Sequence, residues 1–272
     1  MLFCQKLSIF YMISLNETLL HLPALLIAAF FFAIIFIANW LGYKRHKRTT
    51  VLDPDKEISL GTGEASLLGL MGLLLAFSFS MAATKFETRR QTIVDEANLL
   101  NTSVLRCDLY ADSIKMSLLP LYKNYLESRI NYYNAGDNPA KIKDALDDAD
   151  KQFKSIWNYV VPLMKGDNYF KTEQMVQLLI SLKNMVKARE AGRVAAVPTF
   201  IIIVLLTSVL IAAFLAGFGT KPGNRSKLFS VAFVLMTTIV LYVIMELNRP
   251  RQGLINLNSA EQNIVDVRQL FP

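Results

Sequence analysis

Residues 65–84 read ASLLGLMGLLLAFSFSMAAT, and this apolar stretch decides the fold. About 20 mainly apolar residues, rising 1.5 Å each in a helix, cover a bilayer core of about 30 Å. Three further stretches meet this length: residues 22–41, 195–218 and 228–247. None of the four carries an ionised side chain in its central turns, where one would be costly. The sequence therefore predicts an integral membrane protein with four membrane helices.

The composition of the chain agrees with this interpretation. The 272 residues are 53% hydrophobic and only 19% charged, and their mean hydropathy is +0.34. A soluble domain has a more polar surface than this composition allows. The net charge of +7 is spread among the segments that join the apolar stretches, which indicates attraction to anionic lipid. A basic face on a soluble module, as nucleic-acid binding requires, is missing, so we expect no nucleic-acid partner.

The residues that usually carry enzyme or metal chemistry are scarce. Cys4 and Cys107 are the two cysteines, and His21 and His46 are the two histidines. The chain shows no phosphate-binding glycine loop, no nucleophile elbow, and no HExxH or CxxC pattern. We therefore expect no catalytic residues, no metal site, no cofactor and no enzymatic activity.

The apolar stretches divide the chain into five parts. After an N-terminal lead (1–21) come a first membrane hairpin (22–84), a helical bundle (85–192), a second hairpin (195–247) and a C-terminal tail (248–272). The start of the chain lacks the order of a cleaved signal peptide, so we expect the first helix to be retained. The residues between the first two membrane helices, 43–64, read as a hydrophilic loop. The predicted fold is all-α: two hairpins with a helical bundle inserted between the second and third membrane helices.

Helical periodicity is strong in the polar middle. One seam recurs at steps of three and four residues, as on one face of a coiled-coil-like helix. It consists of Ile93, Ala97, Leu100, Val104, Cys107, Ala111, Ile114 and Leu118. A helix start is expected after Asn138–Pro139. We expect the second and third membrane helices to continue out of the bilayer as a stalk, with two further helices packed on it.

Basic residues suggest the orientation in the membrane. The two short connections hold five basic residues (Lys44, Arg45, Lys47, Arg48 and Lys56) and three (Lys221, Arg225 and Lys227), against Lys6 alone in the lead. The positive-inside bias then places both connections in the cytoplasm and the bundle outside, in a multi-pass protein of the bacterial inner (plasma) membrane. The ends of the bundle near the membrane are basic too, which leaves the opposite orientation open.

The second membrane helix carries an unusual face of small side chains. Gly69, Gly72, Ala76, Ser80 and Ala83 follow one another at helical spacing. One interpretation is close packing against another membrane helix, which small residues permit. The other is a pore lined by this helix in an oligomer, where small and hydroxyl-bearing side chains leave room for ions and apolar rings gate by dewetting. The pore-lining candidates are Ser66, Gly69, Gly72, Leu73, Ala76, Phe77, Ser80 and Met81.

Charged residues follow this helix and form a candidate collar at a membrane mouth. Its members are Arg89, Arg90, Glu96, Arg106, Asp108 and, after the last membrane helix, Arg249. Taken singly, such charges are usually solvated or paired at a surface. Taken together, they suggest an anion-selective vestibule.

Residues 67–110, LLGLMGLLLAFSFSMAATKFETRRQTIVDEANLLNTSVLRCDLY, carry the pattern F-x-x-R-R, E-A-N and L-R-x-D-L. With ELNRPRQGLI at 246–255, this block resembles the bestrophin-like domain family of bacterial membrane proteins. The resemblance implies a remote likeness to bestrophins, which are oligomeric anion channels. It singles out the collar residues together with Asn98 and Pro250.

Two functions remain open at this point. The first is a homo-oligomeric ion channel in the lipid bilayer, conducting small inorganic ions, most naturally anions. The second is a non-conducting membrane sensor or scaffold whose bundle binds a partner, which the regular seam of Ile93–Leu118 and the lack of charge deep in the membrane favour.

Overall fold

A computed structural model of the protein describes residues 24–52, 61–136, 138–194, 197–220, 224–249 and 254–271. Within these residues the chain forms eight α-helices and four short 3-10 helices, and no strand. The α-helices are α2 (Ala24–Leu52), α3 (Gly61–Leu105), α4 (Asp112–Asn134), α5 (Pro139–Val160), α6 (Tyr169–Val194), α7 (Thr199–Phe218), α8 (Asn224–Leu247) and α9 (Asn258–Asp266). The predicted lead 1–21 with Cys4, and also Lys56, Lys221 and Pro250, lie outside the described residues.

Four of these helices, α2, α3, α7 and α8, are long and apolar enough to cross a membrane. This confirms the predicted all-α fold with four membrane helices. α3 has 45 residues, which at 1.5 Å each is more than twice what a bilayer core requires. Its apolar part, residues 65–84, therefore spans the membrane, and the part from Lys85 onward lies beyond it.

The predicted hydrophilic loop 43–64 is wrong at both ends, because residues 43–52 belong to α2 and residues 61–64 to α3. α2 continues to Leu52, so His46 and four of the basic residues, Lys44, Arg45, Lys47 and Arg48, are helical. Lys and Arg have high helix propensity. The first residue after this basic run that disfavours a helix is Pro54, because proline restricts the backbone of the residue before it. The third membrane helix was expected to continue into the bundle, but it is separate from it. α6 ends at Val194, and α7 begins after Pro198. Proline lacks the N–H that a continuous helix would need there.

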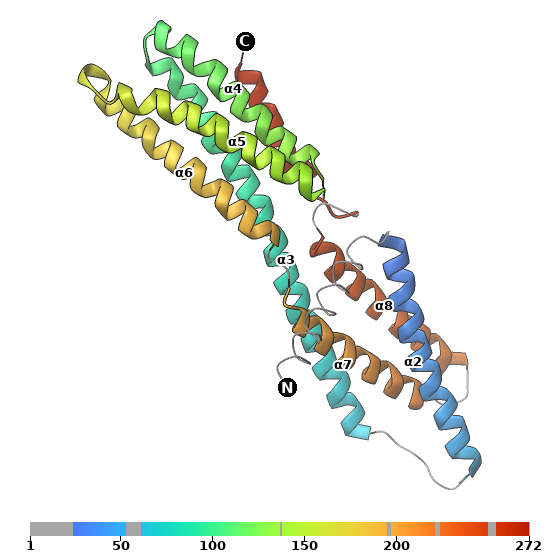
Figure 1. Ribbon diagram of the computed structural model, residues 1–272. Coiled ribbons are helices and arrows are strands. Elements are labelled where there is room, and N and C mark those ends of the chain that lie inside the picture. The colour runs from blue at the N-terminus through green and yellow to red at the C-terminus, as the bar shows by residue number, and fades with distance from the viewer. Residues whose placement is uncertain are drawn as a thin grey trace, which may run out of the picture. The chain divides into compact units, whose positions relative to one another are not determined.

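The described residues fall into two compact units. The first consists of those within Met1–Phe86 and Ala196–Ile255, and the second of those within Glu87–Ala195 and Asn256–Pro272. α3 contributes to both (Figure 1). In the first unit, one core is built from the inward faces of the four membrane helices. Ile27, Phe31 and Ile35 supply the face of α2, at the four-residue steps expected of a helix.

Glycines bring α2 and α7 together within the first unit. A Cβ atom on Gly217 would lie 1.9 Å from the backbone oxygen of Asn39, and one on Gly42 would lie 2.0 Å from that of Phe214. The buried Asn39 side chain bridges the helices, because its Nδ2 donates to Ala213 O at 3.1 Å. Its Oδ1 accepts a 2.6 Å hydrogen bond from Ser230 on α8. Close approach and a shared amide therefore fix three membrane helices relative to one another.

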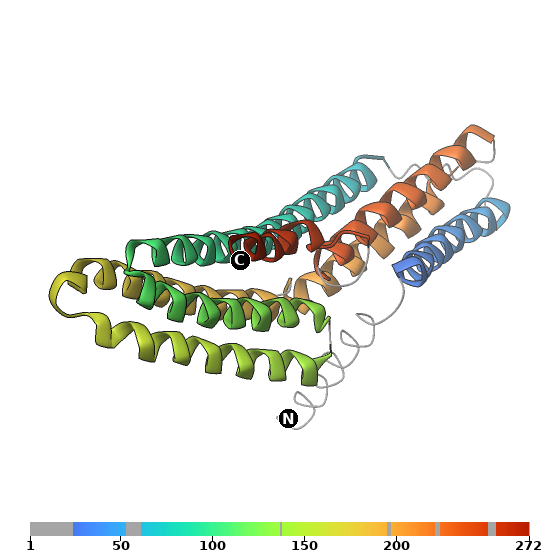
Figure 2. The same cartoon turned by 90° about the horizontal axis from the view of Figure 1, so that it is seen from above.

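The second unit is a helical bundle in which α4, α5 and α6 lie side by side with the latter part of α3 (Figures 1 and 2). The predicted seam is confirmed as core over Ile93–Val104 and at Cys107 and Leu118, which are all buried at its seam positions. It does not form a single helix, however. A 3-10 turn, η1 (Arg106–Leu109), ends α3, and α4 begins at Asp112, so Ala111 is exposed.

A local cap sets the start of α5, and a distant contact sets the position of α9. Asn138 caps α5 as predicted: its side-chain oxygen accepts from the backbone N–H groups of Ala140 (3.1 Å) and Lys141 (3.2 Å), and Pro139 occupies the first turn. The C-terminal residues were predicted as a separate tail. In the structure, α9 packs along α4 (Figure 1), and its residues Ala260 and Ile264 are buried.

Candidate functional site

The membrane part of α3 has a buried face and an exposed face. Met71, Leu75, Ser78 and Ala82 are buried in the core of the first unit. The predicted pore-lining residues Ser66, Gly69, Gly72, Leu73, Ala76, Phe77 and Ser80 are exposed, and Met81 is half-buried. Phe77 is the most exposed of the large apolar residues among them, at 63%. Within the residues that the structure describes, this face of α3 is thus uncovered.

The two glycines on that face, Gly69 and Gly72, do not pack against any other described part of the chain. A Cβ atom on Gly69 or Gly72 would meet nothing within 4 Å. The glycines that allow helices to approach closely are instead Gly42 and Gly217. No described part of the chain therefore requires small side chains at positions 69 and 72.

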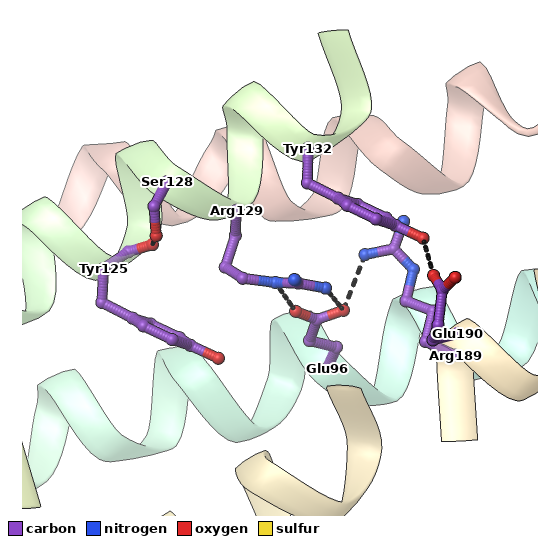
Figure 3. Close-up of polar contacts among 7 residues, drawn as sticks. All are labelled: Glu96, Tyr125, Ser128, Arg129, Tyr132, Arg189 and Glu190. Atoms are coloured by element: carbon purple, nitrogen blue, oxygen red, sulfur yellow. Dashed lines mark hydrogen bonds and ion pairs between the residues drawn. The ribbon is translucent and has the colours of Figure 1, made fainter. Parts of the chain in front are cut away.

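A buried ionic cluster lies at the centre of the second unit. Glu96 on α3 is fully buried, and its carboxylate accepts hydrogen bonds from two arginines (Figure 3). Arg129 on α4 donates from Nε to Oε1 at 2.5 Å and from Nη2 to Oε2 at 3.1 Å. Arg189 on α6 donates from Nη1 to Oε2 at 2.7 Å. One carboxylate therefore joins three helices.

Aromatic rings surround the two guanidinium groups. The centroid of the Tyr132 ring lies 4.8 Å from Cζ of Arg129 and 4.9 Å from Cζ of Arg189. The centroid of the Tyr133 ring lies 3.9 Å from Cζ of Arg189. The Tyr132 hydroxyl donates a 3.0 Å hydrogen bond to Glu190 (Figure 3). Cation–π contacts of this kind offset part of the cost of burying the second positive charge, which Glu96 alone does not neutralise.

The electrostatics of this cluster favour the ionised forms of Glu96 and Arg129. Burial alone raises the pKa of Glu96, but the charges and hydrogen bonds of Arg129 and Arg189 outweigh it and lower the pKa to about 2. Burial likewise opposes the charge on Arg129, and Glu96 more than compensates, so the pKa of Arg129 is raised. A carboxylate held in this way has no proton to exchange near neutral pH. The cluster acts as a structural clamp.

The residues of the predicted collar have separate partners. Arg89 is buried and donates to Gly192 O at 2.9 Å, whereas the exposed Arg90 pairs with Glu87 at 3.0 Å. Further along, Arg106 donates to Gln174 at 2.8 Å, and Asp108 pairs with Lys115 at 2.7 Å. The 17 residues from Arg89 to Arg106 span about 25 Å of helix. One subunit therefore spreads these charges along α3 and η1, and a vestibule formed by several subunits stays a prediction.

The last collar residue, Arg249, lies in the first unit and is 5% exposed. It belongs to a short motif at the end of α8, of which the other described polar residues, Glu246 and Asn248, are also buried. Asn248 Oδ1 accepts from Val197 N at 3.3 Å, just before α7, and Glu246 Oε2 accepts from Leu254 N at 2.9 Å. The motif that sequence singled out after the fourth membrane helix thus secures neighbouring chain segments.

The sequence pattern singles out Glu96 but not its two partners. It placed Arg89 and Arg90 near Glu96, because they precede it by about two turns of the same helix. Arg129 and Arg189 lie 33 and 93 positions away in sequence. The one available signal was an arginine between apolar and aromatic residues of α4, Tyr125, Leu126, Ile130, Tyr132 and Tyr133, all of which are buried.

Comparison with known proteins was consistent with this architecture. The model of one protein family, the bestrophin-like domain, matches residues 29–261. A bacterial bestrophin homologue from Klebsiella pneumoniae carrying one substitution has a similar structure, with a TM-score of 0.70 and 14% identity over 92% of this chain and 99% of that chain. Another structure of the homologue, solved by Zn-SAD phasing, has a TM-score of 0.66 and 14% identity, over 91% of this chain and 99% of that chain. No curated protein matches in sequence. At this identity, the structures establish the shared fold alone.

Proposed function

The chain belongs to the bestrophin-like domain family, and we propose that it assembles into an oligomeric membrane channel for small anions, with α3 lining the pore. Four membrane helices packed around a filled core leave no room for a pore within one subunit. Conduction therefore requires several copies arranged around an axis. This inference fits the family, whose name refers to bestrophins.

The observation that carries the proposal is the uncovered face of α3. It combines small and hydroxyl-bearing residues with the apolar Leu73 and Phe77, which are 52% and 63% exposed. Around a symmetry axis, Gly69, Gly72 and Ser80 would leave room for hydrated ions. Leu73 and Phe77 lie about one helical turn apart and would form apolar rings that close the pore by dewetting.

Anion preference is the finer part of the proposal. Net charge of +7 favours anions near the protein, and Arg90 is exposed on α3 beyond the membrane part. Arg89, in contrast, is occupied by its bond to Gly192 O. Arg90 is therefore the collar residue that we expect to act on passing ions.

A sensor or scaffold remains the second candidate. Its sequence support has weakened, because the seam of Ile93–Val104 is buried in the bundle of its own chain. Two exposed side chains of the bundle still favour it: Met116 and Phe170 are 75% and 76% exposed. Apolar groups so exposed could contact a partner protein.

Chloride flux through reconstituted liposomes tests the channel. We expect the wild-type protein to pass chloride and Phe77→Ala to increase the flux by widening the apolar ring. Phe79→Ala is the matched control, because Phe79 is the same residue type on the same helix, 42% exposed but two positions away and so on another face. Arg90→Gln should lower the chloride-to-sodium permeability ratio. Absence of flux in all four proteins, across voltage and pH, would favour the scaffold instead.

A further inference from the structure

The last two turns of α2 carry a concentrated positive charge. Lys44, Arg45, Lys47 and Arg48 are all exposed, and α2 contains no aspartate or glutamate. They follow directly on the apolar part of the helix, where it is long enough to cross a membrane. Positive charge at such a position faces the headgroup region of a bilayer.

Exposed apolar residues adjoin this charge on the same side of the helix. Trp40 and Leu41 are 48% and 47% exposed, and Lys44 Nζ lies 4.8 Å from the centroid of the Trp40 ring. Trp40, Lys44 and Lys47 follow at steps of four and three, so they share a face. The seven-residue separation of Trp40 and Lys47 corresponds to about 10 Å along the helix, comparable with the distance from the upper acyl chain to the phosphate of a phospholipid.

The opposite side of this segment is fixed by packing in the first unit. Gly42 contacts the backbone of α7 so closely that a Cβ would lie 2.0 Å from Phe214 O. One turn further on, the His46 ring meets the ring of Phe218 edge-on at 5.5 Å. With one face held against α7, the basic and aromatic side chains point away from it.

We propose that this end of α2 binds the headgroup of an anionic phospholipid, with Lys44, Lys47 and Arg48 around its phosphate and the upper acyl chain against Trp40 and Leu41. Charge complementarity identifies the occupant, since α2 presents cations without any carboxylate of its own. A soluble phosphate would use the charge but would leave Trp40 and Leu41 without a role. The site is independent of whether the protein conducts ions.

Trp40 provides a direct probe of the site. The chain has two tryptophans, so Trp157→Phe leaves Trp40 as the sole fluorophore of that type. The protein is reconstituted in phosphatidylcholine bilayers with a minor fraction of brominated lipid, either phosphatidylglycerol or phosphatidylcholine. We expect stronger quenching of Trp40 by brominated phosphatidylglycerol, and a weaker preference at high salt. Equal quenching by the two lipids would overturn the proposal.

Charge-neutralising variants separate this site from general attraction. Each basic side chain near an anionic surface contributes about a fivefold preference for anionic over neutral lipid. Lys47→Gln combined with Arg48→Gln should therefore lower the preference for phosphatidylglycerol by about 25-fold at most. Lys141→Gln with Lys143→Gln removes the same charge from exposed positions of α5 and should leave the preference unchanged. An equal loss in both double variants would refute a local site.

A third arm distinguishes lipid from free phosphate. Inorganic phosphate, added at the ionic strength of a chloride control, should reduce the preference no more than chloride does. Specific competition by phosphate would indicate a soluble-anion site and overturn the assignment to lipid. If Trp157→Phe does not fold, native mass spectrometry of the otherwise unchanged chain makes the same comparison, by counting retained phosphatidylglycerol with and without the Lys47 and Arg48 changes.

Discussion

Arg189 Nη1 donates a 2.7 Å hydrogen bond to Oε2 of Glu96, across 93 positions of sequence. Arg129 holds the other side of the same carboxylate, so α3, α4 and α6 meet at one buried charge. In a bundle whose core is otherwise mainly apolar, such a cluster favours one relative placement of the three helices. Any other register would leave a charge without its partner.

Glu96→Gln should destabilise the second unit strongly. The substitution keeps the size of the side chain but leaves two buried guanidinium groups without a counter-charge, at a cost of about 3–5 kcal/mol. Thermal unfolding of the purified protein, followed by circular dichroism, measures the change. Arg90→Gln is the matched control, since it breaks the exposed pair with Glu87 and should cost no more than about 1 kcal/mol.

Replacing the whole cluster should be milder than breaking it. Glu96→Leu combined with Arg129→Met and Arg189→Met removes every buried charge at similar volume, which is often neutral or stabilising. We expect the triple variant to unfold at a higher temperature than Glu96→Gln. A lower unfolding temperature for the triple variant than for Glu96→Gln would show that the cluster does more for the bundle than neutralise its own buried charges.

Acidification should weaken the clamp only at low pH. The folded-state pKa of Glu96 is about 2, below its ordinary value of 4.5. Its stabilising contribution is therefore complete above about pH 4.5 and is lost as pH falls toward 2, by on the order of 3 kcal/mol. The wild-type unfolding temperature should fall more steeply over this range than that of the triple apolar variant. Parallel pH profiles would contradict the assignment.

The two pairs of glycines should respond differently to an added methyl group. Gly217→Ala places a Cβ against Asn39 O, so α2 and α7 must separate, and we expect a markedly lower unfolding temperature. Gly72→Ala meets open space and should leave the unfolding temperature of the subunit nearly unchanged or slightly raised, by the better helix propensity of alanine. A comparable loss in both variants would show that Gly72 packs within the chain after all.

Gly72→Leu tests assembly. If the exposed face of α3 surrounds a common axis, a bulky side chain at position 72 should disturb the oligomer, while the subunit keeps its helical content. Size-exclusion chromatography with light scattering measures the mass of the assembly. Leu70→Phe is a control of added bulk at an exposed position of the same helix, roughly on the far side of Gly72. Unchanged mass in Gly72→Leu would argue against this face as the centre of the oligomer.

The orientation predicted from the basic residues can be measured by cysteine labelling. In a chain with Cys4 and Cys107 replaced by serine, we introduce Lys47→Cys in α2 or Asn134→Cys at the end of α4, both at exposed positions. A membrane-impermeant maleimide added to intact cells should label Asn134→Cys alone if the bundle is extracytoplasmic. Labelling of Lys47→Cys alone would reverse the topology.

Local sequence patterns predicted the helical elements well, because each depends on neighbours in the chain. Four long apolar runs gave the membrane helices, and Asn138–Pro139 gave the start of α5. Failures occurred where short-range signals compete. The basic extension of α2 looked like a loop because of its charge, and the seam of Ile93–Leu118 concealed the turn at η1, because apolar spacing persists through it.

Hydrophobic length and helical period are properties of consecutive residues, so the sequence alone identifies a four-span, all-helical membrane protein with a bundle between its hairpins. Tertiary structure alone decided which charges are buried and which glycines are in contact. Glu96 pairs with Arg129 and Arg189 rather than with Arg89 and Arg90, which are nearer in sequence. Gly217, rather than Gly72, lies against the backbone of another helix. Such pairings depend on how distant helices pack, and packing is a property of the assembled core that no local pattern records.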